Sequence, residues 1–146
     1  MKTWSYRQGR FLLARLAHGS DLLESIEEAA HREGISVGVV QAIGAVKGAV
    51  LAAYHQDEHR YETITLSGPL ELAHCTGSLS TGTDGRTMAH LHVVFSDEKG
   101  RTFGGHLLKG AWVFAGEASI LELEGPALQR EKDEVTGLNL WRMEGC

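Results

Sequence analysis

One segment of this 146-residue chain has an amphipathic helical repeat, and this limits the fold class more than any other feature of the sequence. The segment predicts a helix over about residues 21–33. Ser20 is the expected N-cap, because its hydroxyl can accept a hydrogen bond from the first turn, and Gly34 is suited to end the helix. The apolar positions at helical spacing are Leu22, Leu23, Ile26, Ala29 and Ala30.

The rest of the chain consists of short apolar segments between turn residues, rich in Gly (18) and poor in Pro (2). Because no helices alternate with these segments, the expected fold is α+β with a mainly antiparallel sheet. Glycines inside strands indicate bulges or close backbone approach. Strands are predicted over residues 11–16, 36–45, 46–54, 61–66, 70–79, 88–96, 101–108 and 112–123.

The length predicts a single domain over residues 1–146, with a core at about 7–124 and a charged tail over 125–146. Leu138, Leu140 and Trp141 predict that this tail packs back on the domain. The chain lacks a signal-peptide pattern and an apolar run long enough for a membrane, so the expected location is cytoplasmic.

The charge and the cysteines exclude further classes. The formal net charge of -5 disfavours a strongly basic nucleic-acid binder, whose affinity comes from neutralising phosphates. The two cysteines, Cys75 and Cys146, make no disulfide framework. Cys75 is expected to be a small buried residue, and Cys146 a free terminal thiol.

The eight histidines are the main source of candidate chemistry. His90 and His92 stand two apart in a predicted strand, so they share one face. If the next turn is a three-residue loop with Gly100 in the left-handed conformation, His106 lies directly opposite His92. A four-residue loop would put His106 on the other face of the sheet.

With the three-residue loop, the three imidazoles converge closely enough to bind a metal ion. Three neutral histidines favour Zn²⁺ or a similar divalent ion and leave a coordination position open. Gly104 and Gly105 would leave room beside the rings for solvent or a small ligand. The alternative is that the histidines are polar residues on a solvated strand face.

Other candidates are weaker. Glu71 is expected to face away from the core, as an exposed carboxylate or as an acid/base group or fourth ligand near the metal. His74 is expected to be partly buried. His18 lies in a turn where it could contact an anion at the helix N-terminus, although an ordinary turn residue is favoured. His31, His55 and His59 are expected at the surface.

Taken together, these motifs resemble the plants-and-prokaryotes-conserved (PPC) domain in its single-domain prokaryotic form. The resemblance covers about residues 7–124, and its most specific part is the pair of motifs at the histidines. The motifs are Arg7-Gln8-Gly9-Arg10, Gln41-Ala42-Ile43-Gly44-Ala45-Val46, Glu71-Leu72, Gly77-Ser78-Leu79-Ser80, His90-Leu91-His92-Val93 and Gly104-Gly105-His106-Leu107.

The resemblance implies a homotrimer with an antiparallel sheet, and a zinc ion on the histidines that match His90, His92 and His106. It also implies a DNA-binding or regulatory role, as prokaryotic members are often described. The plant relatives bind DNA through AT-hooks, which this sequence lacks. Any DNA contact would therefore use a local patch such as Arg7, Arg10 and Arg15.

The fold is also similar to that of α-acetolactate decarboxylase, a zinc enzyme with a comparable histidine motif. This likeness suggests an alternative function, a zinc-dependent enzyme on a small anionic substrate with Glu71 as candidate acid/base. A binding or regulatory protein ranks first, an interaction module with a structural metal second, and the enzyme third.

Overall fold

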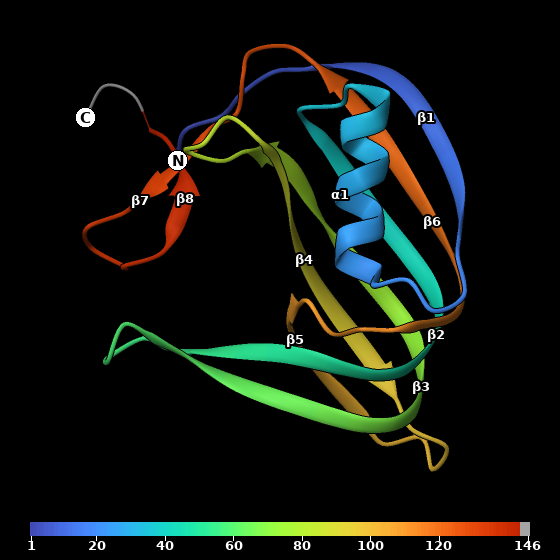
Figure 1. Cartoon of the computed structure of the whole chain (residues 1–146). Coiled ribbons are helices and arrows are strands. Elements are labelled where there is room, and N and C mark those ends of the chain that lie inside the picture. Colours follow the sequence, from blue (N-terminus) through green and yellow to red (C-terminus); the bar gives the residue numbers. More distant parts are fainter. Residues whose placement is uncertain (144–146) are drawn as a thin grey trace.

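Six antiparallel strands form one sheet in the order β1-β6-β2-β3-β4-β5 in the computed structural model, which describes residues 1–143 (Figure 1). Within these residues a single helix covers one side of the sheet, and a two-stranded hairpin follows the last strand. The α+β expectation is confirmed. The elements are β1 (Arg7–Leu16), α1 (Leu22–Glu33), β2 (Gly38–His55), β3 (Arg60–Thr81), β4 (Thr87–Ser96), β5 (Thr102–Leu108), β6 (Val113–Glu124), β7 (Arg130–Lys132) and β8 (Asn139–Trp141).

The predicted strand breaks at residues 45–46 and 67–69 are wrong. Residues 38–55 form one strand and residues 60–81 another. The register between them shifts between Ala42 and Gly44 and between Val46 and Gly48. The turn-like residues therefore bend a continuous ribbon instead of ending it, because local irregularities of this kind increase strand curvature.

This bending lets the sheet close on itself at one end. The first half of β2 pairs with β6, whereas Val50–Ala52 pair with His106–Leu108 of β5. Strand β5 also pairs with β4, β4 pairs with β3, and β3 pairs with β2. These four strands therefore form a closed ring, seen in the lower part of Figure 1. The ring brings β5 beside both β4 and β2.

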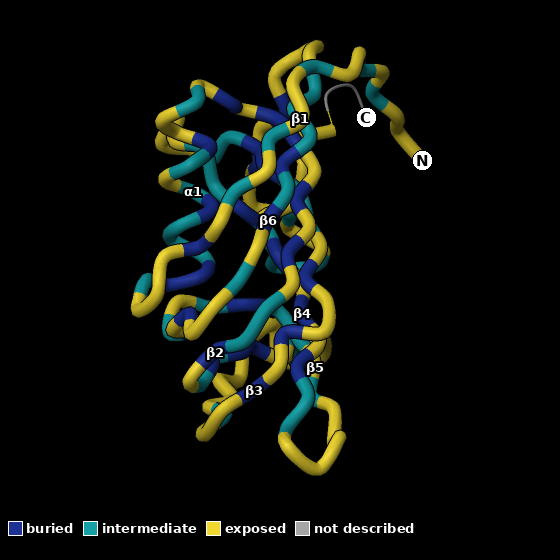
Figure 2. Tube along the Cα trace, turned by 90° about the vertical axis from the view of Figure 1, so that its right-hand side faces the viewer, coloured by how far each residue is buried: buried dark blue, intermediate teal, exposed yellow. Residues whose placement is uncertain are grey.

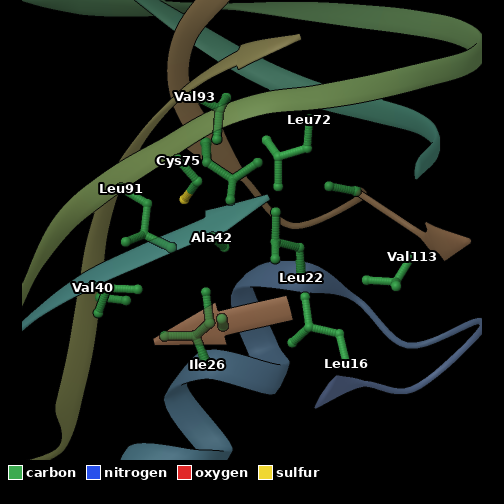
Figure 3. Close-up of a cluster of buried hydrophobic side chains, with 14 of the residues drawn as sticks. Leu16, Leu22, Ile26, Val40, Ala42, Leu72, Cys75, Leu91, Val93 and Val113 are labelled. Atoms are coloured by element: carbon green, nitrogen blue, oxygen red, sulfur yellow. The ribbon is translucent and has the colours of Figure 1, made fainter. Parts of the chain in front are cut away.

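The main core lies between α1 and the sheet. Leu22, Ile26 and Ala30 of the helix are buried against side chains such as Val40 and Leu91 (Figure 3). Burying a Leu or Ile side chain stabilises a fold by roughly 1.5–3 kcal/mol. Buried and exposed residues alternate along the strands (Figure 2), so the sheet has one face toward the helix and one open face.

The N-cap of the helix lies one residue later than predicted. Asp21, not Ser20, is the N-cap, and its Oδ1 accepts from the amide of Glu24 at 3.0 Å. The Ser20 hydroxyl instead donates to the carbonyl of Ala17 at 2.8 Å. Asp21 is preferred because its second oxygen also accepts from the Gly110 amide, at 2.7 Å. Gly34 ends the helix in the left-handed conformation, as predicted.

The tail folds back on the domain, as predicted. Leu128 is buried, and its carbonyl accepts from the amide of Thr81 at 2.9 Å. Trp141 of β8 meets Trp4 edge to face, with ring centroids 6.0 Å apart. Figure 1 accordingly shows the N-terminus beside β7 and β8. Cys146 lies outside the described residues. No helix within residues 1–143 is long and apolar enough to cross a membrane.

Candidate metal centre

The β4–β5 hairpin has the predicted three-residue loop. The Asp97 amide donates to the Arg101 carbonyl at 3.0 Å, and Gly100 has a φ of 75°. In the register that this loop sets, His92 pairs directly with His106. His90 lies two residues along β4 on the same face. The sequence therefore predicted the position of all three imidazoles correctly.

The three rings form one cluster. Ring centroids are 5.1 Å apart for His90 and His92, 4.9 Å for His90 and His106, and 5.6 Å for His92 and His106. One ring nitrogen from each lies within 4.8 Å of the others. Among the described residues this group contains no carboxylate or thiolate. A set of three nitrogen donors fits Zn²⁺ or another borderline divalent ion.

Two of the rings are uncharged at neutral pH. Burial, together with the positive charges of Arg130, His106 and His92, lowers the pKa of His90 to about 4. Burial, His92 and Arg130 also lower the pKa of His106. A neutral imidazole keeps one lone pair for a metal ion, so protons compete little at these two ligands.

Arg130 from the tail lies against the cluster. Its Nη2 donates to His90 Nδ1 at 3.2 Å, and its Nε donates to the Ser80 hydroxyl at 2.8 Å. Its Nη1 donates to the Asn139 carbonyl at 2.9 Å, and the guanidinium stands 5.7 Å from the Trp141 ring. Only 7% of Arg130 is exposed. The sequence did not indicate this residue, because no local pattern links a tail arginine to a histidine 40 positions earlier.

Aromatic residues of the β2–β3 hairpin also lie beside the cluster. The Tyr61 ring lies 5.8 Å from that of His106, and Tyr54 lies 4.8 Å from Tyr61. The Tyr54 hydroxyl donates to the Thr136 carbonyl of the tail at 2.6 Å. The hairpin and the tail therefore meet beside the histidines. The sequence did not indicate these tyrosines either. A period-two pattern tells which face of a strand a side chain is on, but not which distant residue it contacts.

Glu71 is not brought to the histidines. It pairs with Ala45 and Ser96 and lines a separate cavity of about 300 Å³, together with residues such as Lys47 and Phe114. It is absent from the group whose ligand atoms lie within 4.8 Å. Its role as acid/base or ligand stays a prediction.

The prediction for His74 is wrong. The register of β3 against β4 shifts between Leu72 and His74, so the alternation reverses there and His74 is exposed. The same shift turns Cys75 inward, where it is fully buried as expected. Burial raises the pKa of the Cys75 thiol to about 12, which leaves it unreactive.

The remaining histidines have local contacts. His18 Nδ1 lies 2.7 Å from the Phe114 carbonyl oxygen, and its Nε2 lies 3.2 Å from Lys47 Nζ. This matches the turn role favoured for His18. His55 pairs with Glu62 and is half-buried, whereas His31 and His59 are exposed as predicted.

Gly104 and Gly105 do not provide the predicted space for a ligand. A Cβ on Gly104 would lie 3.0 Å from the Val93 carbonyl oxygen, and one on Gly105 would lie 3.3 Å from that of Ala52. Both contacts are with neighbouring strand backbone. The glycines therefore allow β5 to pack closely between β4 and β2. This close packing is a feature of the closed ring.

These features define a class, an α+β protein whose antiparallel sheet presents three histidines at one point. Residues 4–124 match the Plants and Prokaryotes Conserved (PCC) domain, the family that the motifs resemble. The chain belongs to this family.

Solved structures agree over nearly the whole chain. A metal-containing protein of Archaeoglobus fulgidus is 39% identical, with a TM-score of 0.93, and the alignment covers 98% of this chain and all of that one. A PPC protein of Pyrococcus horikoshii is 32% identical, with a TM-score of 0.91 and full coverage of both chains. A structure from Ralstonia eutropha, named as a candidate DNA-binding protein, is 24% identical, covers 90% of each chain with a TM-score of 0.79, and shows the fold alone.

A curated relative is much longer. The bifunctional protein GlmU of a Synechococcus strain is 33% identical over 125 residues, which are 84% of this chain. The chain spans about a fifth of the length of that relative.

Proposed function

We propose that the protein binds one divalent metal ion, Zn²⁺ in the first place, on His90, His92 and His106, and serves as a binding or regulatory protein. The convergence of three imidazole nitrogens within 4.8 Å of one another supports this. So does the metal content of the A. fulgidus relative. Three protein ligands leave a coordination position open, so a bound ion would supply a Lewis-acidic contact for a small ligand.

Elemental analysis of the purified protein tests the metal site. We expect about one metal ion per wild-type chain and loss of that ion in His90→Ala and His106→Ala. His74→Ala is the matched control, because His74 is exposed on the neighbouring strand and outside the cluster. Equal trace metal in all four proteins would refute the site.

A homotrimer, which the family resemblance implies, is the second part of the proposal. Its support is the open face of the sheet, where paired residues form rows across the strands. One row holds Phe11, Leu121, Val39, Ser78 and His90, and the next holds Leu13, Ser119, Gln41, Thr76, His92 and His106. Leu13 is 79% exposed and Phe11 59%, which is a large apolar area for a monomer to leave in water.

Light scattering coupled to size exclusion tests the assembly. We expect a mass about three times the 15.9 kDa of the chain, and dissociation in Leu13→Glu, which would replace the most exposed apolar side chain of this face by a charge. Ser36→Glu, at an exposed position outside the strands, is the control. A monomeric wild-type protein would exclude the trimer.

DNA binding is supported only by the family resemblance and by the names of distant relatives. Two of the three arginines suggested for a DNA patch already have acidic partners. Arg10 lies 2.7 Å from Glu122, and Arg7 lies 3.3 Å from Glu124. A titration with duplex DNA at several salt concentrations tests DNA binding. If the protein contacts several phosphates, its affinity should fall steeply as the salt concentration rises.

An enzyme acting on a small anionic substrate is the alternative. The observation that favours it is the buried Arg130 beside the histidines. Turnover of a panel of keto-acids and esters should then disappear in His92→Ala, while Glu71→Gln tests whether that carboxylate is the acid/base group. No turnover by metal-loaded protein would exclude this function for the panel.

A further inference from the structure

Arg130 is a buried cation without an anionic partner among residues 1–143. No carboxylate within residues 1–143 forms an ion pair with it, and its three hydrogen bonds go to Ser80, Asn139 and His90. Burying a guanidinium without a counter-charge is costly, because the lost hydration is replaced only by neutral dipoles. A guanidinium has five N–H donors, so two of them have no acceptor in the part of the chain that the structure describes.

Among the described residues, no acidic side chain is one of the charged groups that act on His90 and His106. The groups that lower the pKa of His90 and His106, apart from burial itself, are Arg130 and the other histidines, all positive when charged. A divalent ion on three neutral imidazoles would bring two more positive charges beside Arg130. The site as a whole then requires an anion.

Metal binding would also release one of the hydrogen bonds of Arg130. Arginine only donates, so His90 Nδ1 accepts from Nη2 with its single lone pair. If neutral His90 bound an ion through either nitrogen, no lone pair would remain for Arg130. The Nη2 donor would then need another acceptor close to the ion.

We propose that Arg130 recognises the carboxylate of a small ligand bound at the open position of the metal site. This inference rests on the proposed metal site and adds the ligand class and the residue that selects it. Arginine suits this role because its planar fork matches a carboxylate, which can accept two parallel hydrogen bonds. The hydrogen bonds of Nε to Ser80 and of Nη1 to Asn139 do not involve His90, so they would still hold the guanidinium in place once His90 binds the ion.

The proposal predicts that metal and anion bind cooperatively. The ion frees the arginine donor, and the anion neutralises both cations, so each should raise the affinity for the other by the same factor. Without Arg130, this coupling should fall to the direct attraction between ion and carboxylate.

Cobalt-loaded protein titrated with acetate is the test, read out by the visible absorption of Co²⁺. We expect Arg130→Gln to weaken acetate binding about tenfold or more, since the lost hydrogen bonds involve a charged donor. Arg130→Lys keeps the charge without the fork and should lose less. Arg142→Gln, on the same tail and paired with Glu131, is the matched control and should bind as wild type does.

The outcomes separate the two proposals. Wild-type protein that takes up no cobalt overturns the metal site and this inference with it. Cobalt uptake without any spectral response to acetate overturns this inference alone. The same holds if Arg130→Lys and Arg130→Gln both bind acetate within twofold of wild type. Thermal unfolding of each variant verifies that the tail and the domain remain folded.

Discussion

Asp21 is a buried charge that the fold satisfies completely, in contrast to Arg130. It is 3% exposed and accepts from three backbone amides, those of Glu24, Gly110 and Ala111. One carboxylate therefore caps α1 and ties the start of the helix to the chain before β6. The neighbouring Ser20 suits a cap equally well by residue type. What distinguishes the two is the distant loop at Gly110, which no local pattern contains.

Asp21→Ala should be much more destabilising than Ser20→Ala. The first variant loses the helix cap and leaves the amides of Gly110 and Ala111 without a partner, which we expect to cost about 2–4 kcal/mol. The second loses only the two hydroxyl contacts of Ser20, with the carbonyl of Ala17 and the hydroxyl of Ser25, and we expect this to cost about 1 kcal/mol. Urea unfolding of both variants is the measurement. Equal losses would contradict the assignment of Asp21 as the cap.

The half-buried carboxyl group of Glu27 should make the free energy of unfolding depend on pH. Its carboxylate accepts from the Ala89 amide at 2.9 Å, but burial raises its pKa above the usual 4.5. The folded state therefore holds the proton more tightly than the unfolded state, and stability falls as pH rises through the folded pKa. Glu27→Gln should be more stable than wild type at pH 7.

The advantage of Glu27→Gln should vanish below about pH 4, where both states of the wild type are protonated. Thermal unfolding between pH 3 and pH 8 measures it, with Glu28→Gln on the exposed side of α1 as control. A Glu27→Gln variant that is less stable at pH 7 than at pH 4, relative to wild type, would contradict the sign.

At the scale of elements, period-two alternation predicted how the site strands face. His90 and His92 share a face, and the left-handed Gly100 set the register that brings His106 opposite. The same rule failed at His74, because one bulge reverses the faces of every residue that follows. It also did not predict that β2 and β3 continue past their internal glycines as single strands. A glycine indicates irregularity, but whether the strand bends or ends depends on its neighbours.

Gly77 of β3 illustrates this dependence and makes a prediction. A Cβ there would lie 1.9 Å from the carbonyl oxygen of His90, so Gly77→Ala must push β3 away from the strand that holds two of the histidines. We expect a destabilisation of about 1–3 kcal/mol and weaker metal binding.

Gly82→Ala is the matched control for Gly77→Ala. Near the end of β3, its Cβ would come closest to the Asp84 carboxylate at 3.0 Å, an exposed side chain that can move. Denaturant unfolding and metal titration of both variants give the comparison. If Gly77→Ala retained wild-type stability and metal affinity, the close approach of β3 and β4 would not constrain the site.

At the scale of the whole molecule, the candidate site joins three parts of the fold. Two histidines come from β4 and one from β5, the tail contributes Arg130, and the β2–β3 hairpin contributes Tyr61. A bound ion should therefore stabilise the whole domain, because unfolding disperses its ligands.

Thermal unfolding with and without Zn²⁺ measures this linkage. At a free concentration 100 times the dissociation constant, the ion should stabilise the wild type by about 2.7 kcal/mol. His92→Ala should lose this gain and His74→Ala should keep it. Stabilisation of equal size in both variants would mean that the ion acts elsewhere.

The sequence by itself determined the fold class, the helix and the convergence of three histidines, because these follow from short-range periodicity and one tight loop. Only the tertiary structure decided that Asp21 caps the helix, that β5 closes against β2, and that Arg130 and Tyr61 flank the histidines. Each of these joins residues far apart in the chain. Their pairing depends on how a bent sheet and a returning tail fill space, and no local pattern records it.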